Sequence, residues 1–218
     1  MKGIFIALEG PDGSGKSTIM KLLNDYFTER NIDVIVTREP GGTEIGEEIR
    51  RIILDNRYDN MLPETEALLY AASRGQHVHE KILPALNEGK IVICERFILS
   101  SLAYQGVGRN LGIKEVKMIN DFAIKGIRPD LTLFFSVDPE ITLKRKIYIK
   151  GGDRLEREGY EFHNKVYEGY MKLLKMNPAN VKIIDATKSI EEVFKQSIYY
   201  IENILKTKEA EIWSLLLL

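Results

Sequence analysis

The chain has 218 residues, about one domain by length, and its 31 lysines and arginines nearly balance its 32 aspartates and glutamates, for a net charge of −1. This balance excludes a protein that coats nucleic acid polymers, which needs a basic surface, but it leaves room for a basic pocket that binds one small anion. The single cysteine, Cys94, excludes an intrachain disulfide and is typical of a reducing compartment, so we expect a cytoplasmic protein.

Neither end of the chain carries a long apolar segment. The apolar run at residues 4–8 ends at Glu9, and the run at residues 215–218 is equally short. A membrane-spanning helix needs about 20 apolar residues, and a signal sequence needs a longer apolar core than either run offers. We therefore expect neither secretion nor association with a membrane.

The first part of the chain alternates strand and helix patterns. Residues 2–8 and 33–37 predict strands, and residues 17–30 and 44–55 predict helices. The apolar residues expected to face inward are Ile19, Leu22, Leu23 and Tyr26 in the first helix and Ile45, Ile49, Ile52 and Ile53 in the second.

The alternation continues from Pro63, which is favoured in the first turn of a helix and begins a long one. The remaining predicted elements are a strand at 90–94, a helix at 114–125, a strand at 131–137, a helix at 139–149, a glycine- and charge-rich stretch at 150–159, a helix to about 175, a strand at 181–184 and a helix at 190–206.

Strands that are apolar throughout and separated by helices are typical of a parallel sheet with helices on both faces. We therefore predict an α/β protein of three layers, with a five-stranded parallel sheet in the middle. Ligands of such sheets bind at the carboxyl ends of the strands. Polar motifs follow the first three predicted strands, so we expect them to meet at that edge.

The first of these motifs is a phosphate loop. Gly10-Pro11-Asp12-Gly13-Ser14-Gly15-Lys16-Ser17 matches G-x-x-x-x-G-K-[ST] between a predicted strand and a predicted helix, and Thr18 follows it. Backbone N–H groups of such a loop wrap a phosphate, Lys16 adds a point charge at the β- and γ-phosphates, and the Ser17 hydroxyl is the expected Mg²⁺ ligand. We predict a nucleoside triphosphate site; a chance glycine turn is the alternative. A GTPase is disfavoured because the nearest match to the guanine-reading N-K-x-D element, residues 164–167, ends in Tyr167.

Further motifs lie beyond the phosphate loop. They are Thr37-Arg38-Glu39-Pro40-Gly41-Gly42-Thr43, Tyr70-Ala71-Ala72-Ser73-Arg74, Glu95-Arg96-Phe97, Ser100-Ser101-Leu102-Ala103-Tyr104-Gln105-Gly106 and Arg128-Pro129-Asp130-Leu131-Thr132. In order and spacing, this set resembles the thymidylate kinase family over about residues 3–204. The resemblance implies a P-loop NTPase fold with a lid, phosphoryl transfer from ATP to dTMP with Mg²⁺ in dTTP synthesis, and a homodimer. It also implies one P-loop kinase domain at 1–206, with the lid at about 146–160, and leaves 207–218 as a tail of unknown role.

The resemblance assigns a basic pocket to the acceptor phosphate. Arg96 stands where the family clamps that phosphate, and a guanidinium can bind it through two hydrogen bonds. Arg38 and Arg50 are expected partners in the same pocket, and Glu39 is expected to orient them or a water on Mg²⁺. A surface salt bridge is the alternative for Arg38 and Glu39.

A second group of residues matches the family's site for the base and the sugar. Tyr70 and Arg74 are four residues apart and so share one helix face; the resemblance implies a ring that stacks on thymine and an arginine that donates to a base carbonyl. Ser101 and Gln105 match positions that bind the pyrimidine edge, and Tyr104 matches the residue that crowds C2′ of the sugar. A core aromatic is the alternative for Tyr70.

Two of the motifs carry a carboxylate close to the expected phosphate site, at Asp12 and Glu95. Asp12 lies inside the phosphate loop, and the resemblance implies that it reaches the acceptor nucleotide or its metal; a turn-forming role is the alternative. Glu95 stands where the family usually has Asp, so it keeps the carboxylate with one more methylene. We expect Ser17 and Glu95 at the metal, with Glu95 acting through a water or by holding Arg96.

The lid is expected to supply charge to the transition state. The resemblance implies a transition-state arginine either in the phosphate loop or in the lid, and residues 11–14 contain none. Arg154 is the better match and Arg145 the second. With Lys16, Asp12 and Arg96, they complete the expected catalytic residues. A solvated run of charges is the alternative for the lid.

Two other functions stay open at this point. One is a different nucleotide or deoxynucleoside kinase on the same fold, which the Glu95-Arg96 pair supports. The other is a nucleotide-binding sensor or assembly ATPase, which would need the phosphate loop but no acceptor pocket. The histidines, His77, His79 and His163, are not expected to form a metal set with Cys94.

Overall fold

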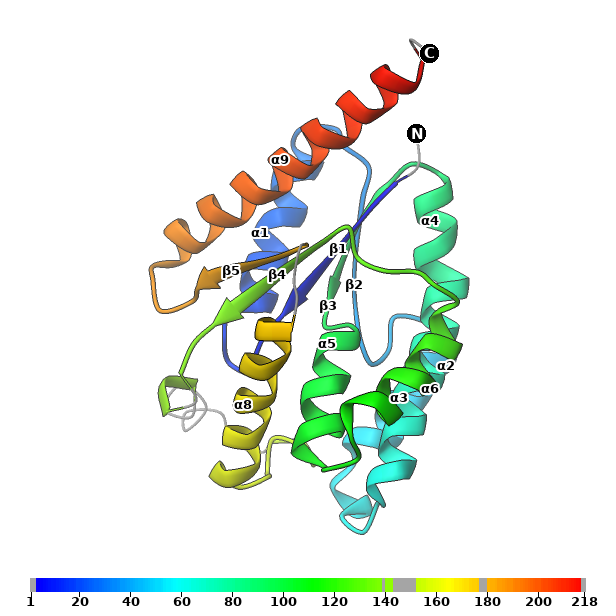
Figure 1. Ribbon diagram of the computed structural model, residues 1–218, viewed down its shortest axis with the longest axis vertical. Helices are drawn as coiled ribbons and strands as arrows, with labels where there is room; N and C mark the ends of the chain where they lie inside the picture. The colour runs from blue at the N-terminus through cyan, green and yellow to red at the C-terminus, as the bar shows by residue number, and fades with distance from the viewer. Residues whose placement is uncertain (1–2, 139, 143–151, 177–179, 217–218) are drawn as a thin grey trace.

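A five-stranded parallel sheet runs through the middle of the protein, in the order β2-β3-β1-β4-β5 among the residues that the structure describes (Figure 1). The structure is a computed structural model, and it describes residues 3–138, 140–142, 152–176 and 180–216. The strands are β1 (Ile4–Glu9), β2 (Val34–Arg38), β3 (Ile91–Glu95), β4 (Leu131–Ser136) and β5 (Val181–Asp185). Each neighbouring pair is parallel, which confirms the predicted sheet.

Helices cover both faces of the sheet, as predicted. They are α1 (Lys16–Thr28), α2 (Glu44–Leu54), η1 (Asn56–Tyr58), α3 (Pro63–His77), η2 (Val78–Ile82), α4 (Leu83–Asn87), α5 (Ile98–Ser101), η3 (Leu102–Gly108), α6 (Ile113–Ile124), α8 (Tyr160–Met176) and α9 (Ile190–Leu216). The helix predicted at 139–149 and the first part of the lid, 146–151, fall largely or wholly outside the described residues.

Side chains of β1 divide the core into two halves. Because successive residues of a strand point to opposite faces, Ile4, Ile6 and Leu8 pack under α1 and α9, whereas Phe5 and Ala7 pack under η2 and α4. Both α1 and α9 lie on one side of the sheet in Figure 1. The sheet is therefore the middle of three layers, buried from both sides.

Helices α2 and α3 leave several apolar side chains exposed. Ile45 and Ile52 were predicted to face inward, but both are exposed, and of the four predicted isoleucines only Ile53 is fully buried. The prediction was wrong because α2 packs against α3 and covers no face of the sheet. Helix α3 buries Glu66 and Arg74 while leaving Leu68 57% exposed. Its polar side faces inward, where the functional site lies.

The last helix is longer than predicted. It was expected to end at residue 206, but α9 continues to Leu216. Residues 207–216 contain neither glycine nor proline and include helix-favouring Lys, Glu and Ala, so nothing in the sequence stops the helix. Within the described residues, no helix is both long enough and apolar enough to cross a membrane.

We predict that Ile201→Ala lowers the free energy of unfolding by about 2–5 kcal/mol, because Ile201 is fully buried between α9 and the sheet. Tyr199 lies on the same helix and is 61% exposed, so Tyr199→Ala should change the free energy of unfolding by about 0.5 kcal/mol or less. Urea denaturation of both variants measures the difference. Equal losses would show that α9 is not docked as described.

Candidate functional site

The carboxyl ends of β1, β2 and β3 open into one cavity of about 470 Å³. Because β3 lies between β1 and β2, the three motifs that follow these strands are neighbours, as predicted. Of the predicted site residues, the cavity is lined by Asp12, Gly13, Gly15, Lys16, Ser17, Thr18, Arg38, Glu39, Arg50, Tyr70, Arg74, Glu95, Arg96, Ser101, Tyr104 and Gln105. Further lining residues, not predicted, are Pro40, Leu54, Ser100, Asp153, Leu155 and Glu156.

The phosphate loop turns directly after β1. Gly10 has a φ of 137°, and a Cβ atom there would lie 2.6 Å from the carbonyl oxygen of Phe135, so only glycine fits. The Lys16 ammonium is buried and donates to the carbonyl oxygens of Gly10 (3.1 Å) and Pro11 (2.8 Å) and to Ser14 Oγ (3.2 Å). Burial lowers the pKa of Lys16 to about 7. Gly10, Pro11 and Ser14 thus shape the loop and hold its lysine without lining the cavity.

Asp12 joins the phosphate loop to the opposite wall of the cavity. Its carboxylate accepts hydrogen bonds from Arg96 and from the Tyr104 hydroxyl, the latter at 2.7 Å. Burial, with the Asp12 charge, raises the pKa of Tyr104 well above its usual range, so the hydroxyl remains a donor. Arg96 has a φ of 66°, a costly conformation for an arginine that is held by these contacts and a bond from its guanidinium to the Gly10 oxygen at 3.0 Å.

Glu9, which sequence reasoning missed, supports the Arg96 loop. The carboxylate accepts from the backbone N–H groups of Phe97 (2.9 Å) and Ser100 (3.1 Å) and from the Ser100 hydroxyl (2.5 Å). Burial raises the pKa of Glu9. Its signal in the sequence is a carboxylate at the end of an otherwise apolar strand, directly before the phosphate loop.

Two guanidiniums meet at one carbonyl group on the β2 side of the cavity. Arg38 donates to the Pro40 oxygen at 2.9 Å, and Arg50 donates to the same oxygen at 3.0 Å. Arg38 also pairs with Glu47 at 2.9 Å. Burial, with the neighbouring Arg38 charge, lowers the pKa of Arg50. Because both guanidiniums reach one carbonyl oxygen, they are close enough to bind one anion together.

Arg74 lies at the cavity wall in a buried network. It donates from Nε to Glu39 Oε2 at 2.6 Å, from Nη1 to Ser101 Oγ at 3.0 Å and to Asn120, and from Nη2 to the Phe97 carbonyl oxygen at 3.1 Å. Both partners of the Arg74–Glu39 pair are almost fully buried. The alternative of a surface salt bridge for Glu39 is therefore wrong, because its partner is Arg74 in the interior.

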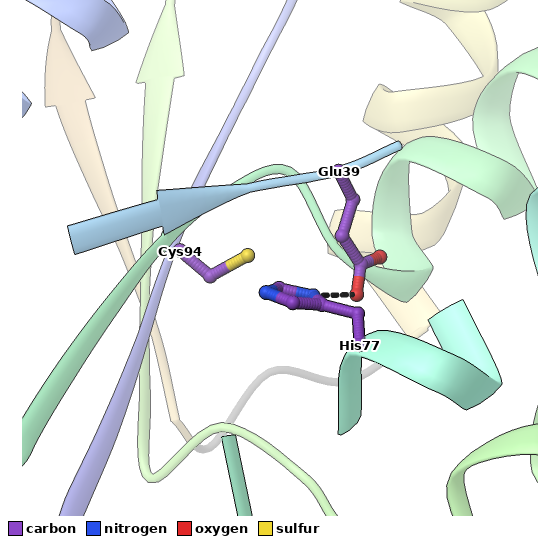
Figure 2. A group of neighbouring side chains, drawn as sticks. All are labelled: Glu39, His77 and Cys94. Carbon is purple, nitrogen blue, oxygen red and sulfur yellow. Dashed lines mark hydrogen bonds and ion pairs between the residues drawn. The ribbon is translucent and has the colours of Figure 1, made fainter. Parts of the chain in front are cut away.

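Glu39 also lies beside His77 and Cys94, and their ligand atoms are all within 4.8 Å of one another (Figure 2). Contrary to the expectation of no metal set, His77 and Cys94 lie, with Glu39, close enough together that the three could hold a metal ion. Both ring nitrogens of His77 have protein partners, Nδ1 with Glu39 at 3.0 Å and Nε2 with Thr37 Oγ1 at 2.8 Å. Because the second Glu39 oxygen binds Arg74, we interpret the group as a support for that arginine.

Ser17 and Glu95, the residues predicted for a metal, lie together. The Ser17 hydroxyl donates to the Glu95 carboxylate at 2.8 and 3.1 Å, and both residues line the cavity beside the phosphate loop. A hydroxyl and a carboxylate are hard oxygen donors of the kind that Mg²⁺ prefers. The donor set therefore fits Mg²⁺, and the longer Glu95 side chain reaches the serine.

Tyr70 and the residues of α5 and η3 form the remaining wall. Tyr70 is half-buried at the cavity, so it is not simply a core aromatic. Ser101 ends α5, and Tyr104 and Gln105 lie in η3, a stretch of π-helix. Such stretches are frequent at functional sites because they change which side chains share a face.

Arg154, the predicted transition-state arginine, does not line the cavity, although its neighbours Asp153 and Leu155 do. Its guanidinium is buried and donates to Glu66 Oε2 at 2.6 Å and to the carbonyl oxygen of Ile53 at 2.9 Å. Arg145, the second candidate, lies outside the described residues. Sequence reasoning also missed Glu66, although it lies four residues before Tyr70 and eight before Arg74, and so on their helix face.

A strand, a phosphate loop and a helix that begins at the loop's lysine form the common core of the P-loop NTPases. A second anion pocket facing that loop is what a kinase among them needs for its acceptor. We therefore place the chain among the P-loop kinases.

Comparison with known proteins gives the family. A family model for thymidylate kinase matches residues 8–197. Thymidylate kinase of Finegoldia magna is 61% identical over 195 residues, which cover 89% of this chain and 96% of that protein. Thymidylate kinase of Lactobacillus acidophilus is 54% identical over 201 residues, covering 91% and 93%. A crystal structure of thymidylate kinase from Ehrlichia chaffeensis matches with a TM-score of 0.75 at 32% identity, covering 93% of this chain and 99% of that one. The chain belongs to the thymidylate kinase family.

We predict that Glu39→Ala lowers the free energy of unfolding by about 3–5 kcal/mol, because it leaves the buried Arg74 without its carboxylate. Glu191→Ala removes the exposed pair with Lys195 and should cost about 0.5 kcal/mol or less. Both values come from urea denaturation. A Glu39→Ala loss below about 1 kcal/mol would contradict the buried pairing described for Arg74.

Proposed function

We propose that this protein phosphorylates dTMP to dTDP at the described cavity, with ATP as phosphoryl donor and Mg²⁺ as cofactor, as a step of dTTP synthesis. The observation that carries the acceptor assignment is the pair of guanidiniums at the Pro40 oxygen, Arg38 and Arg50. They make an anion pocket in a cavity that the phosphate loop also lines. A monophosphate fits this pocket, whereas a neutral nucleoside offers the two guanidiniums no anion to bind. This argues against the alternative of a deoxynucleoside kinase.

The reaction needs alignment and charge neutralisation. An oxygen of the acceptor phosphate attacks the γ-phosphorus of ATP, and the bond from that phosphorus to the bridging oxygen of ADP breaks. Charge moves between the two nucleotides, so the catalytic groups are fixed cations on both sides of the transferred phosphoryl. Lys16 serves the donor phosphates. Arg96 serves the acceptor phosphate, which competes with Asp12 for the guanidinium.

Mg²⁺ would be held by Ser17, with Glu95 near it, and it would supply charge neutralisation at the β- and γ-phosphates. The hydrogen bond from the serine to Glu95 supports this assignment, since both groups face the same point of the cavity. Glu95 also keeps a carboxylate close to Arg96, the next residue in the chain.

The base and the sugar would bind along α3 and η3. Tyr70 offers a ring for stacking, Arg74 and Ser101 offer donors to the base, and Gln105 offers an amide to the pyrimidine edge. Tyr104 would crowd C2′ of the sugar and so disfavour ribonucleotides. The lining of the cavity supports these roles.

The cation for the transition state would come from the lid at about 146–160. Arg154 was the first candidate, but its guanidinium is bound to Glu66 and to the end of α2. We therefore place Arg145 ahead of Arg154 for this role. The wider organisation that we propose is one P-loop kinase domain over 1–206, working in the cytoplasm, with residues 207–218 as an extension of unknown role.

We predict that the protein releases ADP rapidly from ATP and Mg²⁺ with dTMP, and slowly with dUMP, UMP, dCMP, AMP, GMP or thymidine. Arg50→Met should raise the KM for dTMP about 10- to 100-fold, because a hydrogen bond to a charged group contributes about 1.5–3 kcal/mol. Arg51→Met is the matched control, since Arg51 is exposed and pairs with Glu48. Turnover with thymidine alone would indicate a nucleoside kinase, and none with any acceptor would leave only a nucleotide-binding protein.

We also propose that the protein forms a homodimer through α2, α3 and α6. Exposed apolar side chains gather on these helices, which pack side by side (Figure 1). They are Ile45, Ile52, Leu68, Met118 and Phe122, the last 85% exposed. Met118 and Phe122 are four residues apart and share a face of α6. Because α3 turns its polar side to the cavity, a second copy is the occupant we expect on its apolar side.

We predict that Phe122→Glu converts the protein into a monomer, because it places a charge on this apolar face, at its most exposed side chain. Sedimentation equilibrium of the wild-type protein and the variant measures the mass. Tyr199→Glu, at an exposed aromatic on α9, is the control and should leave the dimer intact. A monomeric wild-type protein, or a dimeric Phe122→Glu variant, would contradict this interface.

A further inference from the structure

Glu66 lies where three parts of the chain meet, namely α3, η3 and residues 152–159, which we call the docked segment. Its side chain is 1% exposed. Oε1 accepts from Gln105 Nε2 at 2.9 Å, and Oε2 accepts from Arg154 Nη2 at 2.6 Å. Arg109 donates to both oxygens, at 3.3 and 3.1 Å. One buried carboxylate thus binds a residue of the cavity wall and a residue of the docked segment.

Arg154 anchors the docked segment away from the cavity. Besides the bond to Glu66, Arg154 makes two hydrogen bonds to α2. Its Nε donates to the carbonyl oxygen of Ile53 at 2.9 Å, and its backbone N–H donates to the carbonyl oxygen of Leu54 at 3.2 Å. These oxygens belong to the last turn of α2, where carbonyl groups lack partners inside the helix and a cation is favourable. Asp153 and Leu155, on either side of Arg154, line the cavity as a consequence.

The contact with Glu66 also decides how Gln105 is oriented. An ionised carboxylate only accepts hydrogen bonds, so the side of the Gln105 amide that faces Glu66 must be the NH₂ group. Hydrogen bonds from Gln105 and Arg109 outweigh burial and hold the pKa of Glu66 below its ordinary value, so the carboxylate stays ionised at neutral pH. The amide oxygen of Gln105 therefore points away from Glu66 and is available as a hydrogen-bond acceptor.

The charges around Glu66 balance. Glu66 pairs with Arg154 and Arg109, and Arg109 pairs with Glu158 of the docked segment at 2.5 Å. Two carboxylates and two guanidiniums alternate, and the docked segment supplies one of each. Removing one member leaves a buried charge without its partner, which shifts the others.

We propose that Glu66 is a positioning residue for the acceptor, and that Arg154 acts through it to orient the Gln105 amide. The proposal rests on the proposed function, in which Gln105 binds the pyrimidine edge. An amide oxygen held as acceptor fits a base that offers an N–H donor at N3, as thymine does. The affinity for dTMP then depends on Arg154, although Arg154 does not itself line the cavity.

This role differs from that of a transition-state arginine in what it changes. A transition-state arginine raises kcat by about 10³-fold or more and leaves the binding of dTMP alone unchanged. A residue that positions the acceptor wall changes the dissociation constant of dTMP, even without ATP. Coupling between two such sites typically spans about 5- to 150-fold.

The test measures dTMP binding without ATP, by calorimetry, together with kcat and KM, for the wild-type protein and Arg154→Met. We expect dTMP to bind about tenfold more weakly to the variant, with a kcat within about tenfold of the wild-type value. Arg157→Met, at an exposed arginine of the docked segment, is the matched control and should bind dTMP normally. Unchanged dTMP binding with a kcat about 10³-fold lower would overturn the proposal in favour of a transition-state role.

A double-mutant cycle with Glu66→Gln distinguishes a positioning role of Arg154 from general damage to the fold. If Arg154 acts through Glu66, the double variant Glu66→Gln/Arg154→Met binds dTMP about as weakly as Glu66→Gln alone. Effects that multiply would overturn the proposal. Only variants that melt cooperatively are compared, and Arg154→Gln, which removes the charge but keeps a polar side chain, replaces Arg154→Met if the latter does not fold. A wild-type protein that fails to bind dTMP would contradict the proposed function, whereas equal binding by wild type and variant would contradict only this inference.

Discussion

Charged groups that lie inside the protein must find partners there, and this constraint shapes the whole carboxyl edge of the sheet. A buried charge without a partner costs several kcal/mol, so each one demands a second group of opposite sign nearby. Glu39 pairs with Arg74, and Asp12 pairs with Arg96. Glu66 takes two arginines. Carboxylates thus hold guanidiniums in fixed places in and around the cavity.

The same constraint explains the inverted pattern of α3. A helix on the surface of a globular protein usually turns its apolar side inward, but α3 places Glu66 and Arg74 inside and Leu68 outside. Partners from other parts of the chain, Glu39 for Arg74 and Arg109 and Arg154 for Glu66, make this arrangement tolerable. The cost at the outer surface is an apolar face, which a second copy of the chain would cover. In the dimer proposed above, the cavity and the contact between the two copies would lie on opposite sides of one helix.

The loop that carries Arg96 is held by several hydrogen bonds from both sides. Arg96 keeps an unfavourable backbone conformation because its guanidinium and the loop around it have several fixed partners, Glu9 and Asp12 among them. Holding cations in place before the substrates bind avoids reorganisation during the reaction. Strain at Arg96 and burial at Glu9 are therefore parts of one arrangement, in which Glu9 holds the loop that carries Arg96.

The sequence by itself determined the strands, most helices, the parallel sheet and the phosphate loop, because apolar runs, helical spacing and glycine patterns are local signals. It also predicted that most of the cavity residues lie close together, since motifs that follow neighbouring parallel strands must meet at one edge of the sheet. Partners distant in the chain were decided only by the tertiary structure. Arg154 looked like a free cation beside glycines, and only the fold shows it buried against Glu66, 88 residues away. Ile45 and Ile52 looked like core residues, because a helical stripe does not say whether it faces the interior or another molecule.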